Sequence, residues 1–365
     1  MNNPKKIIIA TGGTGGHIFP AYGLAQHFIS NKINVEIVSD KRGLKFLKNI
    51  PNIKIIKINS ATIFKKNIFK ILFSSIIILF SLIKSFIYLI TNRPDLVFGM
   101  GGYSSFPICI AAKTLGIPFI IYENNLCVGK ANRYLLPFAK KIFVSFQEVE
   151  GIPKKYEIKI CKIGNIIRKE ILNFQGQFRR DASNKKLNIL ILGGSQAAKV
   201  FAEKLPAVFK KCSDANLSFK IYQQCLPQQN KLLTSYYERL KIDFKIFNFS
   251  DDILSYFSKT NLVITRAGAS MLAELINSNI PFICVPLPTA ADNHQFKNAY
   301  YYKKHEYAYL IEEKDLEDKL FLLIKNLNDN QKLLEEIIKK QKQFSDKTVY
   351  QNINHEINNI FNEKN

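Results

Sequence analysis

The sequence predicts an α/β protein in which two doubly wound parallel sheets form separate domains that face each other across a cleft. Three observations support this prediction. The chain has 365 residues, which is more than one compact core usually holds. Strand-like and helix-like stretches alternate in both halves, as in parallel sheets that helices cover on both faces. Each half also opens with a strand, a glycine-rich turn and a helix.

The first half contains short apolar runs that we interpret as strands, separated by stretches with helical patterning. Pro107 suits the first position of a helix and Gly116 suits a C-cap. The expected strands are Lys5–Ala10, Val35–Val38, Ile53–Ile58, Leu96–Phe98, Phe119–Tyr122 and Ile142–Val144. The expected helices include Ala21–Ile29, Ile68–Ile90, Pro107–Leu115 and Lys130–Leu136.

The second half repeats this alternation after a stretch of mixed polarity over residues 162–185, which we interpret as the crossing between domains. Its expected strands are Asn188–Leu192, Ser218–Tyr222, Phe244–Ile246, Leu262–Ile264 and Phe282–Val285, and residues 311–365 are patterned as charged, amphipathic helices. We therefore expect an N-terminal domain over residues 1–164 and a C-terminal domain over 165–340. A final helix within 341–365 is expected to pack back toward the N-terminal domain.

The positive charge is concentrated in the first half. The chain has 52 Lys and Arg against 29 Asp and Glu, a net charge of +23. Residues 1–170 have 25 basic and 8 acidic side chains (25 − 8 = +17), and residues 171–365 have 27 and 21 (27 − 21 = +6). This asymmetry indicates an anionic partner for the first half, although a composition rich in Lys, Ile and Asn also accounts for part of the charge.

The stretch "IIIATGGTGGHIFP", Ile7–Pro20, predicts a phosphate-binding turn. Four glycines lie within five positions between an apolar strand and a helix, where free amides and the helix dipole attract anions. The alternative is a tight turn that binds nothing. A Walker A loop is excluded, because no Gly-Lys-Ser/Thr follows. A dinucleotide fingerprint would need glycine at Ile18, so an NAD site is only weakly supported by Asp40 as a ribose-binding acid.

Three further glycine turns follow the same logic. The first is "VFGMGGYSSFP", Val97–Pro107, with Gly99, Gly101, Gly102 and the hydroxyls of Tyr103, Ser104 and Ser105. The second is "ILGGSQ", with Gly193, Gly194 and Ser195. The third is "ITRAGASMLAE", in which Gly268 and Ser270 open a helix and Glu274 lies one turn inside. A carboxylate at position 274 could accept both ribose hydroxyls while the helix N-terminus holds the diphosphate; the alternative is a solvated helix residue.

These motifs, together with Asp292-Asn293-His294-Gln295, resemble the MurG-type enzymes in order and spacing over nearly the whole chain. Those enzymes are lipid-linked N-acetylglucosaminyltransferases of peptidoglycan synthesis. The resemblance implies a GT-B fold with two Rossmann-like domains. It implies transfer of N-acetylglucosamine from UDP-N-acetylglucosamine to the 4-hydroxyl of the muramyl sugar of lipid I, with inversion, giving lipid II and UDP. No cofactor is implied.

The resemblance also implies site residues. The N-terminal domain would bind lipid I, with Gly101, Gly102, Tyr103 and Ser104 at its diphosphate, and the C-terminal domain would bind the donor. The implied donor contacts are Thr14, Gly15, Gly16, Asn125, Arg168, Ser195, Ser250, Gly268, Ser270, Glu274 and Gln295. Glu274 would be the ribose acid, and Ser250 lies where the uracil binds main chain. The sequence departs from the family's usual residues at Tyr122 (His), Asn124 (Gln), Ile166 (Pro) and Ala197 (Gly).

His17 is the candidate catalytic residue, because attack by a hydroxyl on an anomeric carbon needs a base that titrates near neutral pH. It could act as the general base or stabilise the donor; the alternative is a helix-start histidine that bonds only backbone. The sequence has no Asp-x-Asp triplet. We therefore predict no protein-bound metal, with a helix N-terminus after Arg266, Ser195 and Arg168 neutralising the leaving diphosphate.

The segment Ile71–Ile90 has one charge, Lys84, in 20 residues and is long enough to span a bilayer. A transmembrane helix would place strands of one sheet on opposite sides of the bilayer. A plain core helix is the second alternative, but the polar residues form only a narrow stripe and leave too broad an apolar surface for packing on the sheet alone; they are Asn67, Lys70, Ser74, Ser81, Ser85 and Tyr88. We favour a helix that is part core and part membrane surface. Its basic contacts to anionic headgroups would be Lys65, Lys66, Lys70 and Lys84.

The resemblance implies a peripheral protein on the cytoplasmic face of the bacterial inner membrane. There it would act in cell-wall synthesis, and hence in cell shape and division, with other cell-wall synthesis proteins as partners. Two alternatives belong to other classes. A nucleotide-sugar epimerase of the same architecture needs no lipid acceptor, so the apolar segment disfavours it. A nucleic-acid-binding module lacks the expected basic stripe with interleaved aromatics. The six scattered cysteines favour neither a disulfide scaffold nor a zinc site.

Overall fold

The computed structural model describes residues 5–13, 15–47, 53–60, 68–174, 186–194, 199–250 and 252–363, without the side chains of residues 68 and 70. The chain divides into two compact units. Unit 1 comprises Met1–Lys169 and Asp346–Asn365, and unit 2 comprises Glu170–Ser345. The divisions therefore fall at 169/170 and 345/346, five residues beyond each boundary that the sequence suggested.

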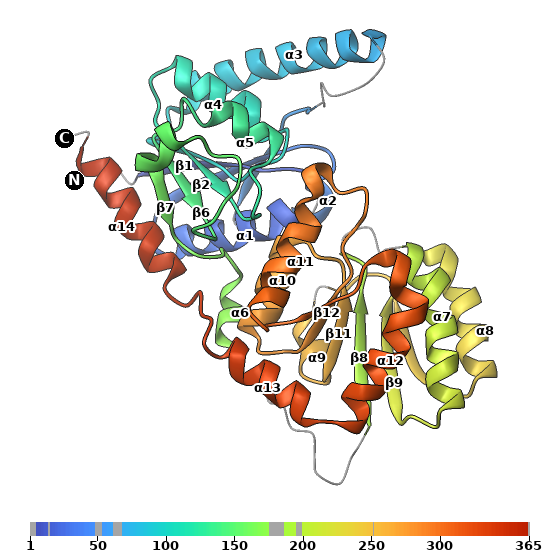
Figure 1. Ribbon diagram of the computed structural model, residues 1–365. Helices are drawn as coiled ribbons and strands as arrows, with labels where there is room; N and C mark the ends of the chain where they lie inside the picture. The colour runs from blue at the N-terminus through green and yellow to red at the C-terminus, as the bar shows by residue number, and fades with distance from the viewer. Residues whose placement is uncertain are drawn as a thin grey trace. The chain divides into compact units, whose positions relative to one another are not determined.

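Unit 1 is built on a parallel sheet with the strand order β3-β2-β1-β4-β5-β6-β7 (Figure 1). Its strands are β1 (Lys6–Ala10), β2 (Asn34–Ser39), β3 (Lys54–Lys57), β4 (Leu96–Gly99), β5 (Phe119–Glu123), β6 (Lys141–Val144) and β7 (Ile160–Lys162). Neighbouring strands pair in parallel throughout, for example Ile7 with Leu96 between β1 and β4. The central strands β1 and β4 are buried along almost their whole length, as expected where helices cover both faces.

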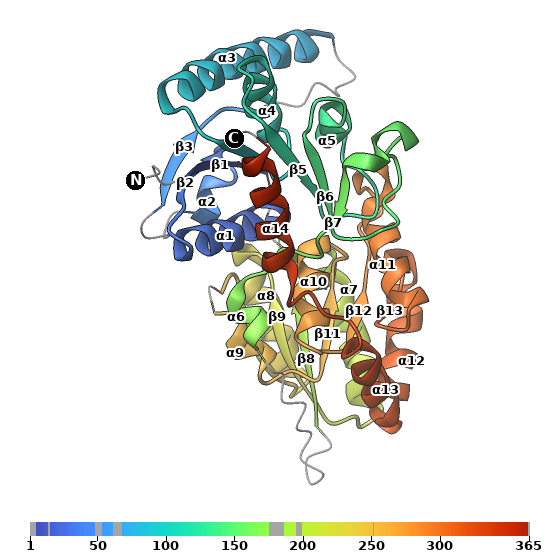
Figure 2. The same cartoon turned by 90° about the vertical axis from the view of Figure 1, so that its left-hand side faces the viewer.

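The helices of unit 1 cover both faces of this sheet (Figures 1 and 2). They are α1 (Gly15–Ser30), α2 (Leu44–Leu47), α3 (Ile68–Asn92), α4 (Ser105–Thr114), α5 (Lys130–Leu135) and α14 (Val349–Asn362). The last helix, α14, lies alongside α1, where His27 Nε2 and Asn354 Oδ1 are 2.8 Å apart and the ring of His27 stacks on Tyr350 (Figure 2). The end of the chain thus completes the unit in which the chain begins.

Unit 2 contains a second parallel sheet with the order β10-β9-β8-β11-β12-β13. Its strands are β8 (Leu187–Leu192), β9 (Phe219–Gln224), β10 (Asp243–Phe247), β11 (Leu262–Thr265), β12 (Phe282–Cys284) and β13 (Tyr309–Leu310). Its helices are α6 (Lys169–Asn173), which starts at the unit boundary, α7 (Lys199–Asp214), α8 (Asn230–Arg239), α9 (Leu254–Phe257), α10 (Ala269–Asn277), α11 (His294–Lys304), α12 (Leu316–Asp329) and α13 (Lys332–Gln341). Apolar side chains of α7 and α12 pack with those of the sheet in one core, including Phe209, Leu320 and Ile264.

Both sheets reverse their strand order beside the first strand of the unit, between β1 and β4 and between β8 and β11. In doubly wound sheets, ligands bind beyond the carboxyl ends of the strands at this reversal. The turns after β1 and β4 are the glycine stretches at Gly12 and Gly101, and those after β8 and β11 begin at Gly193 and Arg266. All four glycine turns therefore lie at the two positions where a doubly wound fold binds its ligands.

The observed elements differ from the expected ones mainly at the edges of the sheets and at helix starts. The short edge strands β7 and β13 were not expected, because two or three residues carry no periodic pattern. Helix α1 begins at Gly15, six residues before the expected start at Ala21, and has Pro20 inside it. The glycine turn is therefore shorter than the sequence indicates, and its last glycines already belong to the helix.

Candidate active site

The two glycine turns of unit 1 are packed directly against each other. Ser104 is fully buried, and its hydroxyl donates to the Thr11 carbonyl at 3.0 Å. A Cβ added at Gly12 would lie 1.8 Å from Ser104 Oγ. Gly102 has a φ of +77°, and a Cβ there would lie 2.9 Å from the Gly12 carbonyl oxygen. Glycine is thus required at both positions, and the hydroxyl of Ser104 serves the packing of the turns.

The first turn is anchored by Asp40, the residue that follows β2. Its Oδ1 accepts hydrogen bonds from the amides of Gly13 at 3.1 Å and Gly43 at 2.9 Å. Its Oδ2 accepts from Ser60 Oγ at 2.8 Å and Arg42 Nη2 at 3.0 Å. Burial acts to raise the pKa of Asp40, but these hydrogen bonds outweigh it and hold the pKa below its ordinary value. Asp40 is engaged in holding the turn, which removes the acid on which an NAD site would depend.

His17 lies where the two turns meet. It is in the first turn of α1, and its carbonyl accepts a hydrogen bond from Thr11 Oγ1 at 3.0 Å. Its half-buried ring lies over the second glycine turn: a Cβ at Gly101, whose φ is +86°, would be 3.0 Å from His17 Cε1 and 3.1 Å from Nδ1. The candidate base and the candidate acceptor turn at Gly101 and Gly102 are therefore neighbours.

The loop after β5 is fixed by a buried carboxylate and by a proline in α1. Glu123 accepts hydrogen bonds from the amide and side chain of Asn125, from the amide of Gly129 and from Asn132 Nδ2, at 2.8–3.1 Å. Pro20 has no N–H to donate to the carbonyl of Gly16 one helical turn before it. Asn124 Nδ2 donates to that carbonyl at 3.0 Å. Asn124 and Pro20 together thus tie the β5 loop to the start of α1.

Arg168 is carried by the segment that leads from β7 to α6. Its guanidinium lies 5.3 Å from the centre of the Phe19 ring, a cation–π distance. Because Phe19 is in α1, the guanidinium of Arg168 packs against the helix that carries Gly15, Gly16 and His17. The structure therefore brings the candidate residues of unit 1 around one end of α1.

In unit 2, the candidate phosphate site is the N-terminus of α10. Gly268 is the N-cap residue, in an extended conformation (φ −73°, ψ 129°), and a Cβ added there would meet no atom within 4 Å. The space beside the N-cap, at the positive end of the α10 helix dipole, is therefore open. Ser270 and Glu274 are both buried and lie four residues apart, so they share one face of α10.

The turn before α10 is held by Arg266 and Gln295. The guanidinium of Arg266 donates to the carbonyls of Val285 and Pro286 at 3.2 Å and forms an ion pair with Glu313. Gln295 Oε1 accepts from the amides of Ala267 at 3.2 Å and Leu287 at 3.0 Å. The side chain of Gln295 therefore joins the loops after β11 and β12.

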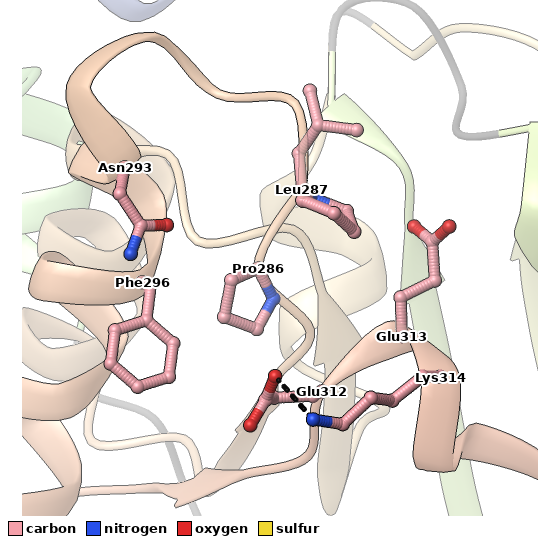
Figure 3. A pocket seen from close by; sticks show the side chains of 8 residues that line it. Pro286, Leu287, Asn293, Phe296, Glu312, Glu313 and Lys314 are labelled. Atoms are coloured by element: carbon pink, nitrogen blue, oxygen red, sulfur yellow. Dashed lines mark ion pairs between the residues drawn. The ribbon is translucent and has the colours of Figure 1, made fainter.

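A pocket of about 380 Å³ lies beside these loops, at the carboxyl ends of β12 and β13 (Figure 3). Prolines and Phe296 form its apolar part, and an ion pair between Glu312 and Lys314 at 3.3 Å lines one side. Its lining residues are Pro286, Leu287, Pro288, Asn293, Phe296, Glu312, Glu313 and Lys314. Glu312 and Glu313 are not among the residues that the sequence suggested, because their only signal is a place two residues after a very short strand.

Of the remaining candidate residues, some lie within the described part of the chain and some do not. Thr14, Ser195, Lys65 and Lys66 lie outside the described residues, as does the side chain of Lys70. Ser250 is half-buried in the loop after β10, and Lys84 Nζ donates to the Lys57 carbonyl at 2.8 Å. Among the residues described, no group of three or more His, Cys, Asp or Glu side chains is arranged to hold a metal ion.

Helix α3 buries polar side chains and exposes apolar ones, the opposite of what an amphipathic helix on a water-soluble core does. Ser74, Ser81 and Ser85 face inward and are buried, and Ser81 Oγ donates to the Asn59 carbonyl at 2.7 Å. The Tyr88 hydroxyl bonds the carboxylate of Glu36. The polar stripe is thus the buried face. The exposed face is made of Phe69, Leu72, Phe73, Ile76, Leu79, Phe80, Ile83, Phe86, Ile87 and Ile90. Within the part of the chain that is described, Ile71–Asn92 is long and apolar enough to cross a membrane, by length and composition alone.

Comparisons with known proteins identify relatives over the whole chain. The model of the glycosyltransferase family 28 N-terminal domain matches residues 7–144, and that of the family 28 C-terminal domain matches residues 188–353. A protein of Pelagibacter ubique (strain HTCC1062) is 37% identical over 98% of this chain and 99% of its own length. It is named UDP-N-acetylglucosamine--N-acetylmuramyl-(pentapeptide) pyrophosphoryl-undecaprenol N-acetylglucosamine transferase.

Two solved structures share the fold. The crystal structure of Acinetobacter baumannii MurG superposes with a TM-score of 0.77 and 27% identity, covering 96% of this chain and 98% of that one. A UDP-N-acetylglucosamine 2-epimerase superposes with a TM-score of 0.64 at 13% identity, covering 98% and 96%. The second similarity is one of fold alone.

The anchoring role of Asp40 predicts a pH-dependent effect of the Asp40→Asn substitution. An amide cannot accept all the hydrogen bonds that the carboxylate accepts, so at pH 7 the free energy of unfolding should fall by about 2 kcal/mol. Because the folded-state pKa is lowered, the carboxylate stabilises the fold above the ordinary Asp pKa of about 3.9 and loses this effect as the pH falls through the folded value.

The difference between wild type and Asp40→Asn, measured by chemical unfolding, should therefore be constant near neutral pH and shrink below about pH 4. The control is Asp214→Asn, which removes an exposed ion pair with Lys210 on α7 and should change the stability little. An Asp40→Asn effect that is absent at pH 7 would contradict the anchoring role.

Proposed function

The chain belongs to glycosyltransferase family 28, and from this membership we propose the roles of its residues in the reaction of the MurG-type enzymes. It is a UDP-N-acetylglucosamine-dependent N-acetylglucosaminyltransferase that acts on lipid I in peptidoglycan synthesis. The observation that carries this function is the 37% identity to a relative of that name over 98% of the chain.

In the proposed donor site, the diphosphate of UDP-N-acetylglucosamine binds at the N-terminus of α10. The open space at Gly268 gives phosphate oxygens access to the N-terminus of α10, where the helix dipole favours their charge. The carboxylate of Glu274 accepts the ribose hydroxyls, and the main chain at Ser250 contacts the uracil. The hydrogen bonds of Arg266 and Gln295 support this role, because they hold the loop before α10 in place before any substrate binds.

In the proposed acceptor site, the diphosphate of lipid I binds the backbone amides of Gly101–Ser104. His17, directly over this turn, accepts the proton of the muramyl 4-hydroxyl. The hydroxyl oxygen forms a bond to the anomeric carbon as the bond from that carbon to the UDP oxygen breaks, so UDP leaves with the electron pair and the configuration inverts. Unit 1 also contributes donor contacts through Thr14, Gly15, Gly16, Asn125 and Arg168.

The charge that develops on the leaving UDP is neutralised by protein groups in this proposal. The α10 N-terminus, Arg168 and Ser195 supply donors, and no protein-bound metal is required. An epimerase shares the fold but would not require an acceptor, and no feature of the described residues favours it over transfer.

We also propose that the exposed face of α3 inserts into the cytoplasmic surface of the bacterial inner membrane. Ten large apolar side chains on one face exceed what a solvated helix normally exposes. The net charge of +17 over residues 1–170 would add attraction to anionic headgroups, including contributions from Lys65, Lys66, Lys70 and Lys84. A peripheral position suits an acceptor whose polyprenyl chain stays in the bilayer.

The proposed reaction predicts a disaccharide-lipid product. Wild-type protein, incubated with UDP-N-acetylglucosamine and a short-chain lipid I analogue in excess chelator, should form the lipid II analogue and UDP at the full rate. His17→Ala should lower kcat by at least about 100-fold while leaving UDP binding unchanged, because proton transfer is lost. Release of free sugar without acceptor would favour the epimerase, and near-normal turnover of His17→Ala would remove its catalytic role.

The proposed diphosphate site predicts a selective effect of Gly268→Ala. The added Cβ meets no protein atom, so the melting temperature should change little, but it occupies the space of the phosphate oxygens. The dissociation constant of UDP, measured by calorimetry, should rise at least about tenfold, the equivalent of one lost charge-assisted hydrogen bond. Unchanged UDP affinity in a stable variant would place the diphosphate elsewhere.

The membrane proposal predicts that Phe69→Ser, Phe73→Ser and Phe80→Ser together abolish flotation with vesicles of anionic lipid. These side chains are 78, 64 and 68% exposed, and each loses at least about 1.5 kcal/mol of transfer free energy. Turnover of a water-soluble acceptor analogue should be unchanged.

The matched control replaces three other exposed apolar residues, Ile158, Leu232 and Leu322, with serine. It should float with vesicles as the wild type does. Equal loss of flotation in both triple variants would contradict a specific role for α3.

A further inference from the structure

The segment that carries Arg168 has no regular secondary structure, yet it is buried and held residue by residue. It runs from Ile163 to Ile167, between the end of β7 and Arg168. Asn165, Ile166 and Ile167 are each at most 2% exposed. Buried backbone outside helices and strands must find partners for its polar groups, and side chains often supply them. The partners of this segment are therefore the groups that determine its path.

Those partners come from β5 and from the last residues of the chain. Asp346 accepts hydrogen bonds from the amide of Asn165 at 2.8 Å and from its side chain at 2.9 Å. The Tyr350 hydroxyl donates to the Ile167 carbonyl at 2.6 Å. Tyr122, in β5, accepts from the amide of Ile166 at 2.9 Å.

The Tyr122 hydroxyl holds the backbone two residues before Arg168. Tyr122 is 2% exposed, and its oxygen is also 2.9 Å from Ser145 Oγ, so the hydroxyl is oriented from two sides. Burial raises the pKa of Tyr122, which keeps it neutral at physiological pH and able to serve both partners. The next residue in β5 is Glu123, which arranges the loop of Asn125.

We propose that Tyr122 is a positioning residue for donor binding: its hydroxyl fixes the Ile166 amide and thereby the point from which Arg168 extends along Phe19. This inference rests on the proposed role of Arg168 as a donor contact. Without the hydroxyl, the Ile166 N–H has no acceptor in a buried site, and the segment must shift to find one. A small shift two residues before a long charged side chain displaces its guanidinium.

The test is a double-mutant cycle with Tyr122→Phe and Arg168→Ala, using UDP-N-acetylglucosamine and a soluble lipid I analogue. Tyr122→Phe keeps the ring and removes only the hydroxyl. It should lower kcat/KM for the donor about tenfold, mainly through KM, with the KM for the acceptor unchanged. In the Arg168→Ala background, the same substitution should have less than about a twofold further effect, because it acts through the arginine.

Tyr237→Phe is the control for a general loss of stability. Tyr237 is a buried tyrosine of unit 2 whose hydroxyl donates to Gln223 at 2.6 Å. It should lower the melting temperature about as much as Tyr122→Phe and leave the KM for the donor unchanged. Kinetics are recorded well below the melting temperature of every variant, so that only folded protein contributes.

The possible outcomes distinguish a failure of the proposed role of Arg168 from a failure of the positioning role of Tyr122. If Arg168→Ala leaves the KM for the donor unchanged, the proposed role of Arg168 is wrong. If Arg168→Ala raises it but Tyr122→Phe has no effect, or the two effects multiply independently, the positioning role of Tyr122 is overturned.

Discussion

The site depends on one steric constraint, the direct contact between the two glycine turns of unit 1. The strands β1 and β4 are neighbours, so the turns that follow them leave the sheet side by side. The Ser104 hydroxyl occupies the space of a Gly12 side chain, and the Gly12 carbonyl blocks one at Gly102. With no side chains between them, the turns pack closely and the His17 ring lies over Gly101. A site arranged in advance avoids the cost of reorganising polar groups during the reaction.

Three buried acids of this unit hold loops in place through hydrogen bonds. Asp40, Glu123 and Asp346 each accept hydrogen bonds from loop amides, and each lies close to a residue that we assign to substrate binding. In unit 2, Arg266 and Gln295 have a similar role around α10. In the proposed site, amides, helix N-termini and cationic side chains would therefore meet the anionic substrates, while these carboxylates are engaged with the backbone. This division agrees with a site for two diphosphates.

The sequence predicted the fold and the glycine turns well, because a strand, a glycine turn and a helix are a local pattern. It could not predict contacts between distant segments. Asp40 suggested a ribose ligand, but its partners at Gly13 and Ser60 meet it only in the fold. The bond from Ile166 to Tyr122 joins residues 44 apart. For α3, the sequence identified the polar stripe correctly, but only the packing revealed that Ser74, Ser81 and Ser85 face inward.

The central claim is that backbone amides at a helix N-terminus bind the donor diphosphate without a cation. A crystal structure of the protein with UDP, grown in excess chelator, tests it most directly. The diphosphate oxygens should lie about 3 Å from the amides of Ala269 and Ser270. A diphosphate bound away from α10, or UDP that binds only when a divalent metal is supplied, would contradict it.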